Sequence, residues 1–239
     1  MADFQRSGIP SAVIYSARRR YLCFGRGPIV VDTESEMGPK DLEQAVQHLR
    51  NGGVVAIPTD TLYGLAADVF NTAALDRIFA IKGRSDDLAL PVLVSGWDQL
   101  EMVAENTPPK TRALAERFWP GALTLVVQKA NGLPDRLTAG GPTVAVRMPG
   151  HPVPIELTNG LGGPITGTSA NISGGADLLT LDELSSQLGE RVDLIVGKGP
   201  TPKGTASTIV DITSGKPKLL REGAISFQQV LEIWETASD

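Results

Sequence analysis

Hydrophobic residues recur along this chain in two alternating patterns, helical spacing and short uninterrupted apolar runs. Between Pro39 and Leu49 apolar side chains recur every three or four positions, and Gly52 and Gly53 follow. Proline is common in the first turn of a helix and glycine just past its end, so this stretch predicts a helix. Residues 54–57 then form an apolar run that is typical of a buried strand.

The same two patterns continue toward the end of the chain and predict an α/β fold. Helical spacing predicts further helices over residues 72–82, 97–104, 109–118, 180–188 and 226–234. Apolar runs predict strands over residues 29–31, 91–94, 123–127, 143–148, 192–196, 208–212 and 217–220, and a further one at Ile165. Several of these strands follow one another closely enough to form hairpins. Helices that alternate with strands and hairpins favour a single domain with a twisted sheet of mixed parallel and antiparallel strands, flanked by helices.

Length and composition are those of a globular protein with one substantial core. The 239 residues are 41% hydrophobic and 21% charged, and no apolar run approaches the roughly 20 residues that span a bilayer. Residues 1–20 lack the pattern of a secretory signal, so we expect a cytoplasmic protein without membrane contact. The net charge of -5 argues against broad coating of nucleic acid, although it allows a local basic cleft.

Cysteine and histidine are too few for several kinds of site. The single cysteine, Cys23, excludes an intrachain disulfide and a cysteine-rich zinc site. The two histidines, His48 and His151, lie in a helical pattern and in a turn, which disfavours a histidine-based triad or metal centre. Chemistry in this chain is therefore expected to depend on lysine, arginine and hydroxyl groups.

Two turns are rich in hydroxyl groups and directly follow apolar runs. They read Pro58-Thr59-Asp60-Thr61-Leu62-Tyr63-Gly64-Leu65 and Thr168-Ser169-Ala170-Asn171-Ile172-Ser173-Gly174. Such residues are ordinary in turns and helix caps, and Asp60 is expected only to stabilise its own turn. They also suit the binding of a small polar ligand or a phosphate. Ser169 and Asn171 occupy alternate positions, so their side chains are expected to diverge.

Three basic residues stand where an anion could bind. Lys82 and Arg84 flank Gly83 at the end of a predicted helix, where cations are favourable for the helix itself. They could equally clamp a triphosphate, with Arg84 bonding two oxygens at once. Arg147 ends an apolar strand and needs an anionic partner, which could be an acidic side chain or a ligand.

Together with the two turns, five further segments resemble the YrdC-like family, the threonylcarbamoyl-adenylate synthases of tRNA modification. In chain order they are Lys82-Gly83-Arg84, Pro120-Gly121-Ala122-Leu123-Thr124, Val144-Ala145-Val146-Arg147-Met148-Pro149, Ser207-Thr208-Ile209-Val210-Asp211 and Leu220-Arg221-Glu222-Gly223. The resemblance spans about residues 40–225 and implies a YrdC-like catalytic domain over residues 37–239, with helices around a concave basic cavity. Residues 1–36, including Arg18-Arg19-Arg20, are expected to form an N-terminal extension.

The resemblance implies an enzyme that makes L-threonylcarbamoyladenylate and pyrophosphate from L-threonine, bicarbonate or CO2, and ATP. A downstream threonylcarbamoyl transferase would use the product on tRNA. The implied magnesium ion arrives with ATP, and no metal site on the protein is expected. The implied ATP-binding residues are Lys82, Arg84, Thr143, Asn171, Thr180 and Arg221, of which Lys82 and Arg84 are also catalytic. The implied L-threonine-binding residues are Thr61, Tyr63, Arg147, Ser169 and Ser207.

At one place the chain departs from the family pattern. Where most members have an asparagine and, five positions later, a histidine, this chain has Leu88 and Leu93. The lost hydrogen bonds are each worth roughly 0.5–1.5 kcal/mol. This departure keeps open an alternative function, a YrdC-like protein that binds RNA in translation without making the adenylate.

Overall fold

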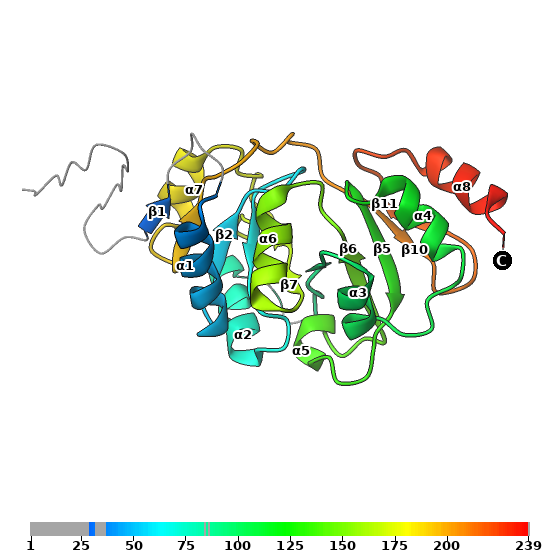
Figure 1. Cartoon of the computed structure of the whole chain (residues 1–239), viewed down its shortest axis with the longest axis horizontal. Helices are drawn as coiled ribbons and strands as arrows, with labels where there is room; N and C mark the ends of the chain where they lie inside the picture. Colours follow the sequence, from blue (N-terminus) through cyan, green and yellow to red (C-terminus); the bar gives the residue numbers. More distant parts are fainter. Residues whose placement is uncertain (1–28, 32–36, 84, 86, 239) are drawn as a thin grey trace, which may run out of the picture.

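The computed structural model describes residues 29–31, 37–83, 85 and 87–238, whose strands form two mixed sheets (Figure 1). The first sheet has the order β1 (Ile29–Val31), β9 (Leu194–Val196), β2 (Val55–Ile57), β3 (Gly64–Ala66) and β8 (Thr168–Ser169). The second has the order β11 (Lys218–Arg221), β10 (Thr208–Asp211), β5 (Leu123–Gln128), β6 (Thr143–Arg147), β4 (Val92–Leu93) and β7 (Ile165–Thr166). Both sheets combine parallel and antiparallel pairs, which confirms the predicted mixed α/β class.

Two predicted hairpins are present, and both lie in the second sheet. Strands β5 and β6 are antiparallel with Val127 opposite Val144, and β10 and β11 are antiparallel with Val210 opposite Leu219. Strand β10 also runs parallel to β5, so the last hairpin extends the sheet that β5 and β6 begin. This arrangement brings the C-terminal end of β6 into the same sheet as the chain around Ser207 and Arg221.

The helices pack around the sheets through their buried faces (Figure 1). They are α1 (Pro39–Arg50), α2 (Thr72–Lys82), α3 (Trp97–Val103), α4 (Thr111–Phe118), α5 (Asp135–Thr138), α6 (Pro152–Leu161), α7 (Leu181–Leu188) and α8 (Phe227–Thr236). Helix α1 buries Ala45, Val46 and Leu49 and packs against α6, while α8 packs against α4. Helices α5 and α6 are not among the predicted elements.

The chain crosses from one sheet to the other at Gly167, between β7 and β8. The Thr166 hydroxyl donates to the Leu65 carbonyl oxygen at 2.8 Å and accepts from the Ala67 amide at 3.0 Å, which ties β7 to β3. A Cβ atom on Gly167 would lie 2.5 Å from Cγ of Leu93, so glycine is needed where this leucine packs. Leu93 is thus part of the buried core, whereas Leu88 is exposed.

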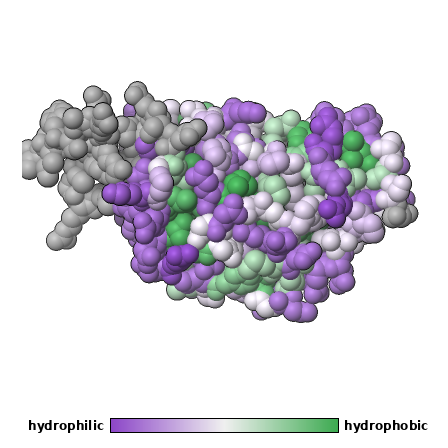
Figure 2. Space-filling model, viewed as in Figure 1, coloured by the Kyte–Doolittle hydropathy of each residue, from purple (hydrophilic) through white to green (hydrophobic). Residues whose placement is uncertain are grey.

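Hydrophilic residues dominate the face of the molecule shown in Figure 2, and the hydrophobic patches on it are smaller and separate. Within the described ranges, no helix combines the length and the apolar character needed to cross a membrane.

Deleting residues 1–36 is expected to lower the thermal midpoint of unfolding by several degrees relative to deleting residues 1–28. Ile29–Val31 forms β1, which pairs in parallel with β9, so the longer deletion leaves β9 as an open edge. A loss of about 2 kcal/mol corresponds to roughly 4–8 °C in a protein of this size. Differential scanning calorimetry of the two truncations measures the difference. Equal midpoints would show that β1 contributes nothing to stability. The boundary between the N-terminal extension and the catalytic domain at residue 36 stays a prediction.

Candidate functional site

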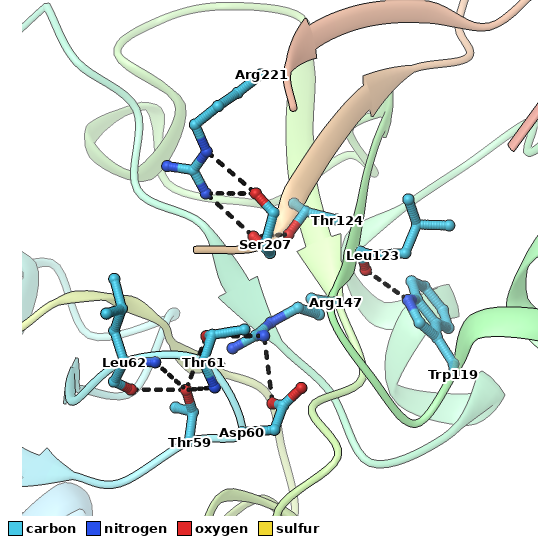
Figure 3. A network of polar contacts seen from close by, with 10 residues as sticks. All are labelled: Thr59, Asp60, Thr61, Leu62, Trp119, Leu123, Thr124, Arg147, Ser207 and Arg221. Atoms are coloured by element: carbon cyan, nitrogen blue, oxygen red, sulfur yellow. Dashed lines mark hydrogen bonds and ion pairs between the residues drawn. The ribbon is translucent and has the colours of Figure 1, made fainter. Parts of the chain in front are cut away.

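The turn between β2 and β3 is held by a buried threonine. The Thr59 hydroxyl donates to the Leu62 carbonyl oxygen at 2.6 Å and accepts from the amides of Thr61 and Leu62 at 3.1 and 3.2 Å. It also lies 3.0 Å from the Thr61 hydroxyl. Because these bonds fix the backbone of the turn, the side chains of Asp60 and Thr61 project from a rigid support (Figure 3).

Arg147, at the end of β6, reaches across to this turn. Its Nη1 donates to Oδ1 of Asp60 at 3.2 Å and to the Thr61 hydroxyl at 3.1 Å. The Arg147 and Asp60 side chains are only 6% and 9% exposed. Burial lowers the pKa of Arg147, the Asp60 carboxylate acts against that shift, and the nearby Arg221 adds to it. The prediction that Asp60 only stabilises its turn is therefore wrong, because Asp60 is the acidic partner of Arg147. We call Thr59, Asp60, Thr61 and Arg147 the Arg147 cluster.

Tyr63 connects this turn to the second hydroxyl-rich turn. Its side chain is buried, which raises the pKa of the phenol, and its carbonyl oxygen accepts from the Ala170 amide at 2.8 Å. Strands β3 and β8 pair directly beside it, with Gly64 opposite Ser169. The two hydroxyl-rich turns therefore lie side by side.

The second turn is built around the ammonium group of Lys82. Nζ of Lys82 donates to the carbonyl oxygens of Ser169 and Asn171 at 2.6 and 2.9 Å and to Oδ1 of Asn171 at 3.1 Å. Gly83 ends α2 in the left-handed region at φ 55°, and the Lys82 carbonyl oxygen accepts from the Ser173 amide at 2.8 Å. We call Lys82, Ser169 and Asn171 the Lys82 cluster.

The expectation that Ser169 and Asn171 diverge is wrong. The Ser169 hydroxyl donates to Oδ1 of Asn171 at 2.7 Å, and Nδ2 of Asn171 donates to the Gly175 carbonyl oxygen at 2.8 Å. Oδ1 of Asn171 thus accepts from both Ser169 and Lys82, because the turn bends both side chains toward the buried ammonium. A buried cation that binds three oxygens of one turn orders that turn.

A third cluster comprises Thr124, Ser207 and Arg221, and we call it the Arg221 cluster. Nη2 of Arg221 donates to the Ser207 carbonyl oxygen at 2.8 Å and to the Ser207 hydroxyl at 3.1 Å, and Nε donates to the same carbonyl oxygen at 3.1 Å. The Ser207 hydroxyl lies 2.8 Å from that of Thr124, on β5. Burial lowers the pKa of Arg221, and the carboxylate of Asp177 opposes that shift. Figure 3 shows Arg221 and Ser207 on one side and the Arg147 cluster below them.

Hydrogen bonds at Pro200 and Gly204 hold the loop between β9 and β10 near the Arg147 cluster. Nε2 of His151 lies 2.9 Å from the Pro200 carbonyl oxygen, and Nδ1 accepts from the Val153 amide at 3.2 Å. Burial lowers the pKa of His151, which favours the neutral ring that this pattern requires. Further along the loop, the Gly204 amide donates to the Thr61 carbonyl oxygen at 2.9 Å. These contacts hold the loop that leads to Ser207.

The remaining candidate residues do not join these clusters. Thr143 starts β6, and Arg147 ends it, so the two lie about 13 Å apart along the strand. Among the described residues, no hydrogen bond links Thr143 to any of the three clusters. The Thr180 hydroxyl accepts from the Glu183 amide at 3.2 Å as the N-cap of α7. Arg84 lies outside the described residues.

Sequence reasoning overlooks three residues of the site. Asp60 and Thr124 lie inside segments that the motifs single out, but only their partners give them a role. His151 is expected in a turn, and nothing in its local sequence signals the contact with Pro200. The described ranges also contain no group of three or more histidine, cysteine or acidic residues that could hold a metal ion.

Taken together, the three clusters form a site with two arginines from strands β6 and β11 of the second sheet and a turn rich in hydroxyl groups. The positive charge of Arg221 is close enough to lower the pKa of Arg147, and an anion bound between the two guanidinium groups would relieve this repulsion. Arg147 already has one carboxylate, while Arg221 bonds only neutral oxygens of Ser207 among the described residues. The arrangement suits a small ligand with a carboxylate beside a second, more strongly anionic ligand.

Comparisons with known proteins identify relatives of this chain. The family model described as "Telomere recombination", for Sua5, YciO and YrdC proteins, matches residues 47–223. The chain is 41% identical over 203 residues to the threonylcarbamoyl-AMP synthase of Bacillus subtilis, covering 84% of this chain and 59% of that protein. It is 36% identical over 169 residues to the threonylcarbamoyl-AMP synthase of Thiobacillus denitrificans, covering 71% of this chain and 89% of that protein.

Solved structures show the same fold. The chain superposes on Pyrococcus abyssi Sua5 in complex with L-threonine with a TM-score of 0.82 and 35% identity, covering 86% of this chain and 60% of that one. It superposes on Escherichia coli YciO with a TM-score of 0.73 and 26% identity, covering 80% and 93%. It thus spans about three fifths of the Bacillus and Pyrococcus proteins and most of the others. The chain belongs to the Sua5/YciO/YrdC family.

Proposed function

We propose that this protein is a threonylcarbamoyl-AMP synthase. It converts L-threonine, bicarbonate and ATP into L-threonylcarbamoyladenylate, pyrophosphate and water. The observation that carries the proposal is the Arg147 cluster, a buried arginine beside hydroxyl groups, in a fold that matches Pyrococcus abyssi Sua5 complexed with L-threonine. Relatives named threonylcarbamoyl-AMP synthase, at 35–41% identity, support the same activity.

The amino acid binds at the turn between β2 and β3. Arg147 holds its carboxylate, and Thr61, Ser169 and Ser207 hold its polar groups, with Tyr63 as a wall of the site. The amino group captures bicarbonate or CO2 as N-carboxythreonine, whose new carboxylate attacks the α-phosphorus of ATP. Holding both reactants in one site raises their effective concentration and orients them for the attack.

ATP binds on the side of Arg221 and the Lys82 cluster, which includes Asn171, with further contacts from Arg84 and, from outside the three clusters, from Thr143 and Thr180. Arg221 and Arg84 neutralise the charge that grows on the phosphates as pyrophosphate leaves. A magnesium ion enters with ATP as part of the substrate. Lys82 acts chiefly by ordering the turn, because its ammonium already donates to three oxygens of Ser169 and Asn171.

The product is a mixed anhydride that water destroys, so a partner must consume it. That partner is a threonylcarbamoyl transferase acting on tRNA in the cytoplasm. We further propose that this chain binds RNA directly. The RNA would contact the basic residues around the site or Arg18 to Arg20, which lie outside the described residues.

Pyrophosphate release is expected only when ATP, L-threonine and bicarbonate are all present. A coupled pyrophosphate assay with each substrate omitted in turn measures this, and mass spectrometry with labelled bicarbonate identifies the adenylate. D-Threonine serves as the matched control, because it carries the same groups in the wrong arrangement. ATP turnover that ignores L-threonine, or RNA binding without any adenylate, would instead support the non-catalytic alternative.

A further inference from the structure

Only one of the two Asp60 carboxylate oxygens accepts a hydrogen bond from the described residues. Oδ1 accepts from Arg147 at 3.2 Å, whereas no hydrogen bond from the described residues reaches Oδ2. Among the described residues, the only buried side-chain polar atom without a hydrogen-bond partner is the Thr111 hydroxyl. Oδ2 of Asp60 therefore remains in contact with solvent. A Cβ atom at Gly150 would lie 3.5 Å from Oδ2, in van der Waals contact, so the glycine keeps a side chain away from this oxygen.

Likewise, only one of the three nitrogens of the Arg147 guanidinium donates hydrogen bonds to the described residues. Nη1 makes both of its hydrogen bonds, to Asp60 and Thr61, and in the described part of the chain Nε and Nη2 make none. The side chain is only 6% exposed, so these unoccupied donors are held in place by packing. Nε and Nη2 of a guanidinium form the parallel pair of donors that fits a carboxylate.

Two charged groups of opposite sign thus each present an unoccupied polar edge within one small cluster. An anionic ligand alone would be attracted by Arg147 and repelled by Asp60, so the pair would gain little from binding it. A ligand that carries an anion and a cation on one carbon atom matches both groups. An α-amino acid in its zwitterionic form is such a ligand.

We propose that Asp60 determines the specificity of this site for amino acids by accepting a hydrogen bond from the ligand's α-ammonium group at Oδ2. Arg147 binds the α-carboxylate through Nε and Nη2 at the same time. The assignment rests on the proposed function and adds to it a residue that reads the amino group. It requires the site to reject a carboxylic acid that has a hydroxyl in place of the ammonium group.

The test compares two ligands on two proteins by isothermal titration calorimetry. The ligands are L-threonine and (2S,3R)-2,3-dihydroxybutyrate, which differ only at the α-substituent. Wild-type protein is expected to prefer L-threonine by about 10-fold or more, because the ammonium group adds a charge–charge attraction to the hydrogen bond at Oδ2 that a neutral hydroxyl lacks. Asp60→Asn is expected to lose most of that preference, with weaker L-threonine binding and unchanged or tighter binding of the dihydroxy acid. Asp60→Glu keeps the carboxylate and is expected to restore part of the preference.

A merely structural role for Asp60 predicts a different result. If Asp60 only orients Arg147, both ligands lose affinity equally in Asp60→Asn, and that outcome would overturn the assignment. Equal affinity of wild-type protein for the two ligands would also overturn it, even if Asp60→Asn failed to fold. Asp135→Asn, which breaks the surface ion pair with Lys129, is the matched control and should change neither affinity. Wild-type protein that binds no L-threonine at all would overturn the proposed function together with this assignment.

Discussion

Replacing Arg147 with alanine is expected to weaken L-threonine binding by about 2–5 kcal/mol, or roughly 30-fold to several thousand-fold. The guanidinium is buried and bonds Asp60 and Thr61, so its loss leaves Asp60 without its partner and removes the cation that we propose binds the ligand carboxylate. ATP binding should change far less, because we propose that the phosphates bind on the side of Arg221. Calorimetric titration of the variant with each ligand measures the two effects.

The control for this variant is Arg112→Ala. Arg112 forms an exposed ion pair with Glu116 within α4, with a side chain that is 70% exposed, and such pairs contribute little. This variant should bind both ligands as the wild type does. If Arg147→Ala lost affinity for L-threonine and ATP equally, the division of the site between Arg147 and Arg221 would be wrong.

Lys82→Met is expected to destabilise the fold by about 3 kcal/mol or more and to weaken ATP binding strongly. The buried ammonium bonds three oxygens of Ser169 and Asn171, and a methionine of similar length removes this donor from both carbonyl oxygens and leaves Oδ1 of Asn171 with only the Ser169 hydroxyl. The turn that carries both residues then loses its order. Urea denaturation measures the stability change, and titration with ATP measures the change in affinity.

Lys40→Met provides the comparison, since Lys40 is an exposed residue near the start of α1. It should leave both stability and ATP binding close to those of the wild type. Unchanged stability of Lys82→Met with a complete loss of ATP binding would contradict the turn-ordering role of Lys82. The lysine would then be a direct phosphate ligand that the turn does not need.

Much of the fold follows from local patterns in the sequence. Helix α2 is predicted with the bounds that the structure shows, because its apolar residues keep a helical period and Gly83 supplies the left-handed residue that ends it. Helix α6 escapes prediction because Pro154 and Gly160 disrupt the pattern, although Pro152 fits the first turn of a helix. The short strands β3 and β8 escape it too, because they overlap the two hydroxyl-rich segments, whose composition predicts turns.

The amino-acid sequence alone establishes which residues are available for the chemistry: two hydroxyl-rich turns, three basic side chains and an ordered set of motifs that identifies the family. Which of these residues meet is known only from the folded chain. Asp60 and Arg147 are 87 residues apart, Lys82 and Asn171 are 89 apart, and Thr124 and Ser207 are 83 apart. Helical period and turn composition report on neighbours within a few residues. The pairing of charges and hydroxyl groups depends instead on how strands far apart in sequence align, and that alignment is set by burial of the whole core.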